Sequence, residues 1–251
     1  MISLIIPTIH HTDLVKHCVN SFINTAHEAY EIIVVDDGSP PPIQQDLAAW
    51  AASMNVRFIP KETNEGFSRT VNLGLRHASG SYALLANNDI IFHEPGWLQH
   101  MLAAMRLSPE VGIVGARLLY PDMTIQHGGV IRGPKWNFDH RYRFQPADYP
   151  PALAVEDAAS VTGALMLIRK EVFDRIGLFS EEFFIAYEDV DFCYRARQHG
   201  FRVIYSGAAC ALHYEGFTRG TTRANKNRYW RVKEMEARKK FWAKWGGYHI
   251  Q

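Results

Sequence analysis

The chain has 251 residues, of which 47% are hydrophobic and 21% charged, a composition that excludes disordered and fibrous proteins. No apolar stretch approaches the roughly 18 residues of a membrane-spanning helix. The short apolar start, residues 2–7, lacks the basic flank and cleavage site of a signal peptide. Cys18, Cys193 and Cys210 are far apart without metal-ligand spacing, which favours buried thiols in a reducing cytoplasm. We therefore expect a cytoplasmic protein.

The first 117 residues alternate short apolar strands with amphipathic helices, which is typical of βαβ units and a parallel sheet. The expected strands cover residues 2–7, 31–36, 56–60, 81–86 and 111–116. The helices between them keep the 3.6-residue apolar period. Thr12, Ser39 and Asn64 are the expected caps of the first three, Gly80 ends the third, and Pro95 opens the fourth.

The second half is less regular. Residues 118–151 are rich in Gly, Pro, His and aromatic residues and predict short strands and long loops. After them we expect a strand at 160–168, a short helix at 172–176, a helix at 188–199, a strand at 201–206 and a basic helix at 225–245. Because no repeat or linker interrupts the chain, we predict a single α/β domain over residues 1–251.

Polar side chains follow three of the expected strands. These are Thr8 after the first, Asp36 and Asp37 after the second, and Asp89 in an Asn-Asn-Asp triplet after the fourth. In an open parallel sheet, ligands bind beyond the carboxyl ends of the strands, where the strand order reverses. Each group alone is also a good turn former, but their joint placement indicates a binding edge.

Three carboxylates, Glu188, Asp189 and Asp191, lie in a stretch that starts at Tyr187, directly after the apolar run 178–186. In a first helical turn they complement the helix dipole. An apolar wall beside a carboxylate also raises its pKa toward the range of a general base. Glu188 and Asp191 would share one helix face while Asp189 points elsewhere. One carboxylate can then serve the site while another pairs with Arg195 or Arg197.

Asp89 is the first candidate for a metal ligand, because Mg²⁺ binds through one or two carboxylates plus substrate phosphates. His213 could add a nitrogen ligand, which suits Mn²⁺ better, although a His after an apolar strand is more often structural. The sequence contains no phosphate loop, no Gly-x-Ser-x-Gly and no His-Glu-x-x-His. Local signatures of nucleophilic or zinc-protease chemistry are therefore missing.

An ordered set of motifs resembles the family 2 inverting glycosyltransferases of the GT-A fold. It comprises Pro7-Thr8, residues 33–39, 64–67 with 72–75, 84–89 and 188–191. Residues 118–122 with 125–129, 161–164 and 213–216 look most like the rhamnosyltransferase-like branch. The resemblance implies a Rossmann-like, mostly parallel nucleotide-binding sheet, continuous with a smaller mixed region on the acceptor side.

The resemblance also implies roles for individual residues. Asp189 matches the family's catalytic base, and Asp89 and His213 match its ligands for Mn²⁺ or Mg²⁺. The donor would be bound by Pro7, Thr8, Asp36, Asp37, Asn64, Gly66, Asn87, Asn88, Gly163, Ala164 and Arg219. Glu188, Asp191 and His127 would contact the acceptor. The Asn-Asn-Asp triplet has one carboxylate where many members have two or three.

By this resemblance the protein is a glycosyltransferase that moves a sugar, with inversion, from a nucleoside-diphosphate sugar to a hydroxyl of a glycan or lipid-linked glycan. The branch points to dTDP-rhamnose as donor. Residues 1–117 would bind the nucleotide sugar, 118–218 the acceptor, and 219–251 would form a basic lid and helix. The alternatives are a sugar nucleotidyltransferase, which normally has a Gly-rich loop after the first strand, and a non-catalytic binding module.

The C-terminal segment is strongly basic. Ten Lys and Arg residues lie between Arg219 and Lys244, against only Glu234 and Glu236. A solvated helix explains this pattern. Aromatic residues interleaved with the basic ones also suit peripheral contact with the inner face of a membrane, and Arg219 with Arg223 could close over the diphosphate. No motif supports nucleic acid as a partner.

Overall fold

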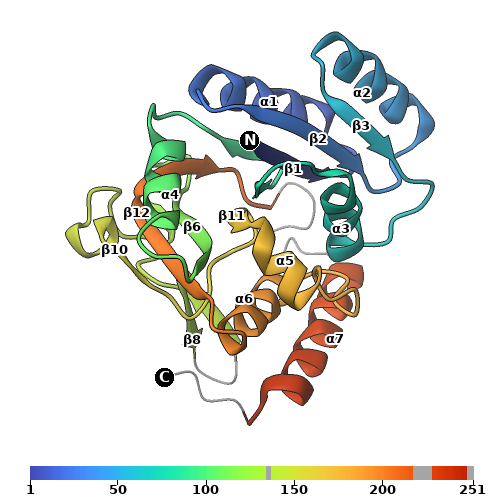
Figure 1. Ribbon diagram of the computed structural model, residues 1–251. Helices are drawn as coiled ribbons and strands as arrows, with labels where there is room; N and C mark the ends of the chain where they lie inside the picture. The colour runs from blue at the N-terminus through green and yellow to red at the C-terminus, as the bar shows by residue number, and fades with distance from the viewer. Residues whose placement is uncertain (134–136, 217–227, 248–251) are drawn as a thin grey trace.

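The computed structural model describes residues 1–133, 137–216 and 228–247 (Figure 1). The strands are β1 (Ile2–Thr8), β2 (Tyr30–Asp36), β3 (Arg57–Pro60), β4 (Tyr82–Ala86), β5 (Ile90–Ile91), β6 (Val111–Leu119), β7 (Ile125–His127), β8 (Val130–Gly133), β9 (Asn137–His140), β10 (Val155–Asp157), β11 (Leu165–Arg169) and β12 (Arg202–His213). The helices are α1 (Thr12–Thr25), α2 (Pro41–Ser53), α3 (Phe67–His77), α4 (Trp97–Met105), α5 (Lys170–Ile176), α6 (Glu188–Gln198), α7 (Arg228–Trp245) and the short 3₁₀ helix η2 (Pro150–Leu153).

A 10-stranded sheet forms the centre of the molecule, in the order β10-β12-β6-β11-β4-β1-β2-β3, with β5 on β12 and β7 on β6. β1 pairs in parallel with both β2 and β4, and β12 pairs in parallel with β6. β11 is antiparallel to its neighbours β4 and β6, and β10 is antiparallel to β12. The predicted α/β architecture with a mostly parallel sheet is confirmed. The strand order reverses between β1 and β4, which is where a ligand is expected.

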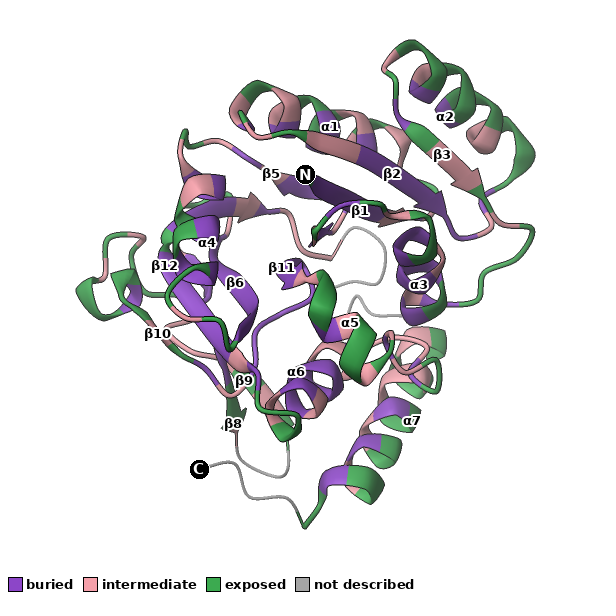
Figure 2. Ribbon diagram, viewed as in Figure 1, coloured by how far each residue is buried: buried purple, intermediate pink, exposed green. Residues whose placement is uncertain are grey.

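Helices cover both faces of this sheet because side chains alternate along each strand. α1, α2 and α4 share one apolar core with Leu4 and Ile6 of β1. α3, α5 and α6 share a second core that includes Ile5. Figure 2 shows buried residues along the central strands and on the sheet-facing sides of the helices. The helices therefore fix the position of every strand end that reaches the site.

Several expected element boundaries differ from the observed ones. Thr12, Ser39 and Asn64 do not cap helices, because the N-cap positions are His11, Pro40 and Gly66. α3 ends at His77 rather than at Gly80. Gly80 lies against β1 instead, and a Cβ on it would meet the Ser3 Oγ at 2.7 Å. The strand expected at 160–168 begins only at Leu165, and that expected at 201–206 continues to His213 as β12.

The basic helix α7 packs against α6. Phe241 and Trp245 are buried in a third core with Phe183, Val190 and Tyr194. These two of the aromatic residues that interleave with the basic ones therefore do not face a membrane. Within the described part of the chain, no helix combines the length and apolar composition that crossing a membrane requires.

Candidate functional site

A cavity of about 760 Å³ opens at the carboxyl ends of β1 and β4. Most of the side chains expected at a site line it: Pro7, Thr8, Asp37, Asn64, Gly66, Asn87, Asn88, Asp89, Gly163, Ala164, Glu188, Asp189 and His213. They come from strand ends, from the 160–164 loop and from the start of α6. The fold thus brings residues from both halves of the chain to one place.

The ends of the central strands are tied together by hydrogen bonds. Asn88 Nδ2 donates to Thr8 Oγ1 at 2.9 Å, which joins the end of β4 to the end of β1. The Asn87 backbone N–H donates to the Ala164 carbonyl at 2.9 Å. The floor of the cavity is therefore held by contacts between strand ends rather than by a free loop.

Asp37 organises the segment after β3. Its carboxylate accepts hydrogen bonds from Lys61 Nζ at 2.7 Å and from the backbone N–H groups of Glu65 and Gly66, each at 2.9 Å. Gly66 has φ +91°, and a Cβ there would meet the Phe184 carbonyl oxygen at 2.5 Å. The Asp37 carboxylate and Gly66 together allow residues 61–66 to close one wall of the cavity.

Asp89 and His213 meet because β5 pairs with the end of β12, where Ile90 opposes His213. Asp89 Oδ1 lies 3.1 Å from His213 Nε2, and both side chains are nearly buried. The two side chains can form an ion pair when the imidazole is protonated. They can share a metal ion when Nε2 carries a lone pair instead of a hydrogen. Adjacent ligands of an octahedral ion with bonds of 2.0–2.1 Å are about 3 Å apart, so the oxygen and nitrogen fit Mg²⁺ or Mn²⁺.

Asp189 lies in the first turn of α6 and faces the 160–164 loop. The Gly163 N–H donates to its Oδ2 at 3.0 Å, and the Val190 N–H donates to its Oδ1 at 2.8 Å. A Cβ on Gly163 would already be 3.4 Å from the Asp189 Cβ. Two N–H donors hold this carboxylate in one orientation at the cavity wall.

The chain enters α6 through two strained residues. Ala186 and Tyr187 have φ values of +67° and +68°. Non-glycine residues in this region cost on the order of 1–3 kcal/mol each and cluster at functional sites. The strained turn aims Glu188 and Asp189 into the cavity.

Asp36, His127 and Asp191 are expected site residues that do not line the cavity, which corrects their assigned roles. Asp36 is buried and accepts hydrogen bonds from Ser39 and from Gln44 Nε2, so it shapes the turn after β2. His127 is buried between the Ala116 carbonyl and the Thr162 N–H, so it supports the 160–164 loop instead of an acceptor. Arg219 lies outside the described residues.

Asp191 is the third correction. It is fully buried and binds Arg195 Nε at 2.9 Å, Lys244 Nζ at 2.7 Å and Trp245 Nε1 at 2.9 Å. The pairing with Arg195 was one of the expected alternatives. This placement does not support an acceptor contact, because Asp191 instead attaches α7 to α6.

Other cavity residues were not expected. They include Gln126, His140, Arg143, Glu215, Trp230, Arg231, Glu234 and Arg238. Gln126 and Glu215 belong to the motifs quoted above, which was an available signal. The α7 residues could not be found from the sequence, because only the packing of α7 on α6 brings them to the cavity.

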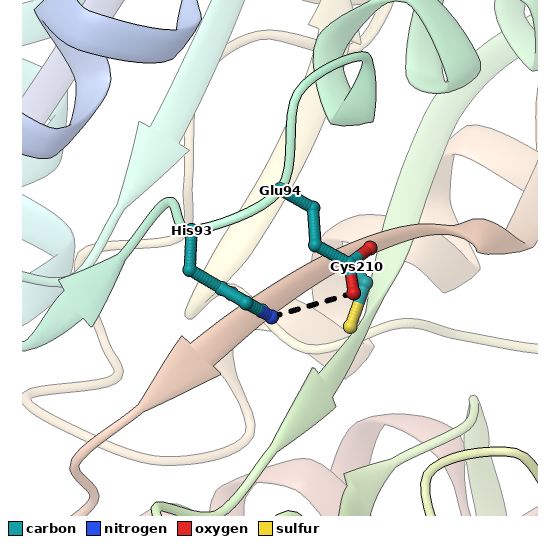
Figure 3. Close-up of side chains that lie close together, drawn as sticks. All are labelled: His93, Glu94 and Cys210. Atoms are coloured by element: carbon teal, nitrogen blue, oxygen red, sulfur yellow. Dashed lines mark ion pairs between the residues drawn. The ribbon is translucent and has the colours of Figure 1, made fainter.

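A second group of metal-ligating side chains lies outside the cavity lining of the described chain. His93, Glu94 and Cys210 place their ligand atoms within 4.8 Å of one another (Figure 3). Burial raises the pKa of the Cys210 thiol to about 11, against the opposing effect of the nearby Arg117 guanidinium. Because a guanidinium beside the sulfur competes with a metal cation, we assign this group no role in transfer. All three cysteines are buried and free, as expected.

Comparisons with known proteins agree with this geometry. The chain is 29% identical over 253 residues to "Uncharacterized protein y4gI" of Sinorhizobium fredii, covering 96% of this chain and 27% of that protein. It is 28% identical over 239 residues to "O-antigen biosynthesis protein RfbC" of Myxococcus xanthus, covering 91% and 18%. It is 24% identical over 218 residues to "N-acetylglucosaminyl-diphospho-decaprenol L-rhamnosyltransferase" of Mycobacterium tuberculosis, covering 75% and 68%. The chain thus spans only about a quarter or less of the first two proteins.

Two solved structures share the fold. The mannosyltransferase PcManGT from Pyrobaculum calidifontis, in complex with GDP-Man and Mn²⁺, superposes with a TM-score of 0.69 at 18% identity over 97% of this chain and 63% of that chain. GalNAc-T7 with UDP, GalNAc and Mn²⁺ superposes with a TM-score of 0.71 at 17% identity over 85% of this chain and 43% of that chain. These similarities confirm the expected GT-A fold.

The sequence profile described as "Glycosyl transferase family 2" matches residues 3–177, which include the strand-end motifs and the loop that contacts Asp189. Together with the relatives and the fold, this match confirms the expected family. The chain belongs to glycosyl transferase family 2.

Proposed function

We propose that the chain transfers a sugar from a nucleoside-diphosphate sugar, with inversion, to a hydroxyl group of a glycan or lipid-linked glycan. The observation that carries the proposal is the hydrogen-bonded Asp189 carboxylate, which lines the same cavity as the Asp89–His213 pair. A base and a cation site in one cavity meet the two needs of direct displacement, which are removal of the acceptor proton and neutralisation of the leaving diphosphate.

In this proposal Asp189 takes the proton from the acceptor hydroxyl as its oxygen attacks the anomeric carbon. The Gly163 and Val190 N–H groups hold both carboxylate oxygens and thereby fix its direction. Asp89 and His213 would hold a divalent metal ion, which supplies positive charge for the departing diphosphate. Thr8, Asp37, Asn88 and Ala164 would surround the donor, since all four line the same cavity.

We further propose that the chain acts as one unit, with residues 1–117 binding the donor and 118–218 forming the acceptor side. This is supported by the sheet, which combines β1 to β4 from the first part with β11 and β12 from the second. α7 lines the cavity through Trp230, Arg231 and Arg238.

For the donor we propose dTDP-rhamnose, because one relative is named as an L-rhamnosyltransferase.

For α7 we propose peripheral contact with an anionic membrane through its exposed Tyr229, Val232 and Met235 beside basic residues. Flotation with anionic and with zwitterionic vesicles tests this contact, and binding that is equal for both or missing from both contradicts it.

The function is tested by measuring release of nucleoside diphosphate from a panel of nucleotide sugars, with and without Mn²⁺ and in the presence of candidate glycan acceptors. We expect release from one class of donor that depends on acceptor and is stimulated by Mn²⁺. Pyrophosphate chemistry without sugar transfer would indicate a nucleotidyltransferase instead. Binding without turnover across the panel would contradict the proposed reaction.

A further inference from the structure

The side chain of Gln126 lies behind the imidazole of His213. Gln126 is the central residue of β7 and only 1% exposed. Its Oε1 lies 2.5 Å from His213 Nδ1, and its Nε2 lies 3.4 Å from both the His213 carbonyl oxygen and Glu215 Oε2. Because both neighbours of the amide nitrogen are acceptors, the amide can satisfy them only with its NH₂ group on that side. The carboxamide oxygen therefore faces His213.

This orientation determines the tautomer of His213. A carboxamide oxygen only accepts hydrogen bonds, so His213 Nδ1 must carry the hydrogen. In the neutral ring, Nε2 then keeps its lone pair. Nε2 is the atom that lies 3.1 Å from Asp89 Oδ1 and 3.4 Å from Asn87 Nδ2, a donor. The Asn87 donor agrees with a lone pair on Nε2, and the Asp89 oxygen beside that lone pair leaves the position between the two acceptor atoms to a cation.

Gln126 is itself held in place by a polar network. The backbone carbonyl oxygen of Gln126 lies 3.0 Å from His140 Nδ1, and β7 is paired with β6. Glu215, the second partner of its amide, lies 3.3 Å from the Tyr120 hydroxyl and 3.5 Å from an Arg143 nitrogen. The carboxamide therefore has one orientation available, which makes it able to orient the imidazole.

We propose that Gln126 is a positioning residue that sets the tautomer and ring orientation of His213, and so makes Nε2 available to a divalent cation shared with Asp89. The inference rests on the proposed function, which places the metal at these two residues. Outer partners of metal-binding histidines typically change metal affinity by 10- to 100-fold.

The test compares Gln126→Met, which keeps the length of the side chain but removes the acceptor, with Gln126→Glu, which keeps an acceptor oxygen. Gln145→Met, a change at an exposed glutamine, is the matched control. In metal-free protein labelled with ¹⁵N-histidine, long-range ¹H–¹⁵N spectra report the tautomer of His213. We expect the Nδ1–H form in wild type, Gln126→Glu and Gln145→Met, and conversion toward the Nε2–H form in Gln126→Met.

Titration with Mn²⁺ alone, followed by electron paramagnetic resonance, measures the affinity. We expect Gln126→Met to weaken binding by about 10- to 100-fold and Gln126→Glu to restore most of it. An unchanged tautomer in Gln126→Met overturns the inference. Equal losses of Mn²⁺ affinity in Gln126→Met and Gln126→Glu overturn it too, since they indicate a merely structural role. Wild type that binds no Mn²⁺ contradicts the proposed metal site instead, while the tautomer still decides whether Gln126 orients His213.

Discussion

At the scale of single residues, the site depends on carboxylates whose surroundings differ although they are close in sequence. Asp189 is held at the cavity by two backbone N–H groups, whereas Asp191, two residues later, is buried among cations. The two N–H groups fix the direction in which Asp189 presents its oxygens to the cavity, whereas the oxygens of Asp191 are occupied by structural partners.

Replacing Asp189 by Asn tests the base directly. The amide keeps the shape of the side chain but cannot take a proton, so we expect kcat to fall by about 10²–10⁴-fold. Donor binding, measured by thermal shift with the nucleoside diphosphate, should stay near the wild-type value. Asp174→Asn, on the exposed surface of α5, is the control. Near wild-type turnover in Asp189→Asn would show that another group is the base.

Gly66 offers a second test at this scale. Gly66→Ala places a side chain at a positive φ and against the Phe184 carbonyl, whereas Gly177→Ala, at φ +75°, meets no atom within 4 Å. We expect Gly177→Ala to lower the free energy of unfolding by about 1–3 kcal/mol, because ψ −172° places it in a backbone region that only glycine adopts readily. Gly66→Ala should lower the free energy of unfolding by about 1–3 kcal/mol more than Gly177→Ala, because the added methyl group also overpacks the cavity wall against Phe184. Urea unfolding measures the free energy of unfolding of both variants. Equal losses would mean that Phe184 moves aside at no cost when a side chain is added at Gly66.

At the scale of elements, the position of α7 depends on α6. The Asp191 carboxylate joins Arg195 of α6 to Lys244 and Trp245 of α7, and the apolar contacts of Phe241 lie beside it. Since α7 contributes Trp230, Arg231 and Arg238 to the cavity wall, this buried contact controls the shape of the site from outside it.

Asp191→Asn should therefore loosen α7. Removing one partner from a buried ion pair typically costs about 3–5 kcal/mol, and we expect a loss of this order in urea unfolding. Faster hydrogen exchange along α7 should accompany it. Lys240→Met is the matched control, because Lys240 contacts the Glu182 carbonyl at an exposed position, where the expected change is below about 1 kcal/mol. Comparable losses in both variants would contradict the role of Asp191.

At the scale of the whole molecule, buried histidines make stability depend on pH. Burial lowers the pKa of His127 well below its usual value and also lowers the pKa of His140. His127 thus stays neutral in the folded chain when the unfolded chain begins to take up a proton. Its contribution to stability is complete above about pH 6.5 and is lost as the pH falls below that value.

The expected loss from His127 is up to about 1.4 kcal/mol per pH unit below 6.5. His127→Gln should show a shallower fall in the free energy of unfolding between pH 6.5 and 5.5, measured by urea unfolding at each pH. His27→Gln, at an exposed position, should keep the wild-type slope. A slope unchanged by His127→Gln would assign the acid sensitivity to other groups.

Much of the site could be predicted because parallel strands deliver their carboxyl ends to one edge. Apolar runs with a period of two or 3.6 residues identified the strands and helices of the first half, and Thr8, Asp37, Asn88 and Asp89 followed from the strand ends. Helix boundaries were less predictable, as at Asn64 and Gly80, because the same residue types serve turns, caps and close strand contacts. The side-chain orientations of Asp36 and Asp191 were not predictable, since each side chain binds partners that other elements bring to it.

By itself, the sequence determined the fold class, the order of the strands along the chain and the polar groups at their ends, because these follow from short-range periodicity and turn chemistry. Only the tertiary structure decided which of those groups meet. The pairing of β5 with β12 brings Asp89 to His213, and β7 places Gln126 behind that imidazole. The packing of α7 on α6 surrounds Asp191 with partners and keeps it out of the cavity. These contacts join residues as far apart in the sequence as Asp89 and His213, and their formation depends on the free energy of the whole packed sheet rather than on any local pattern.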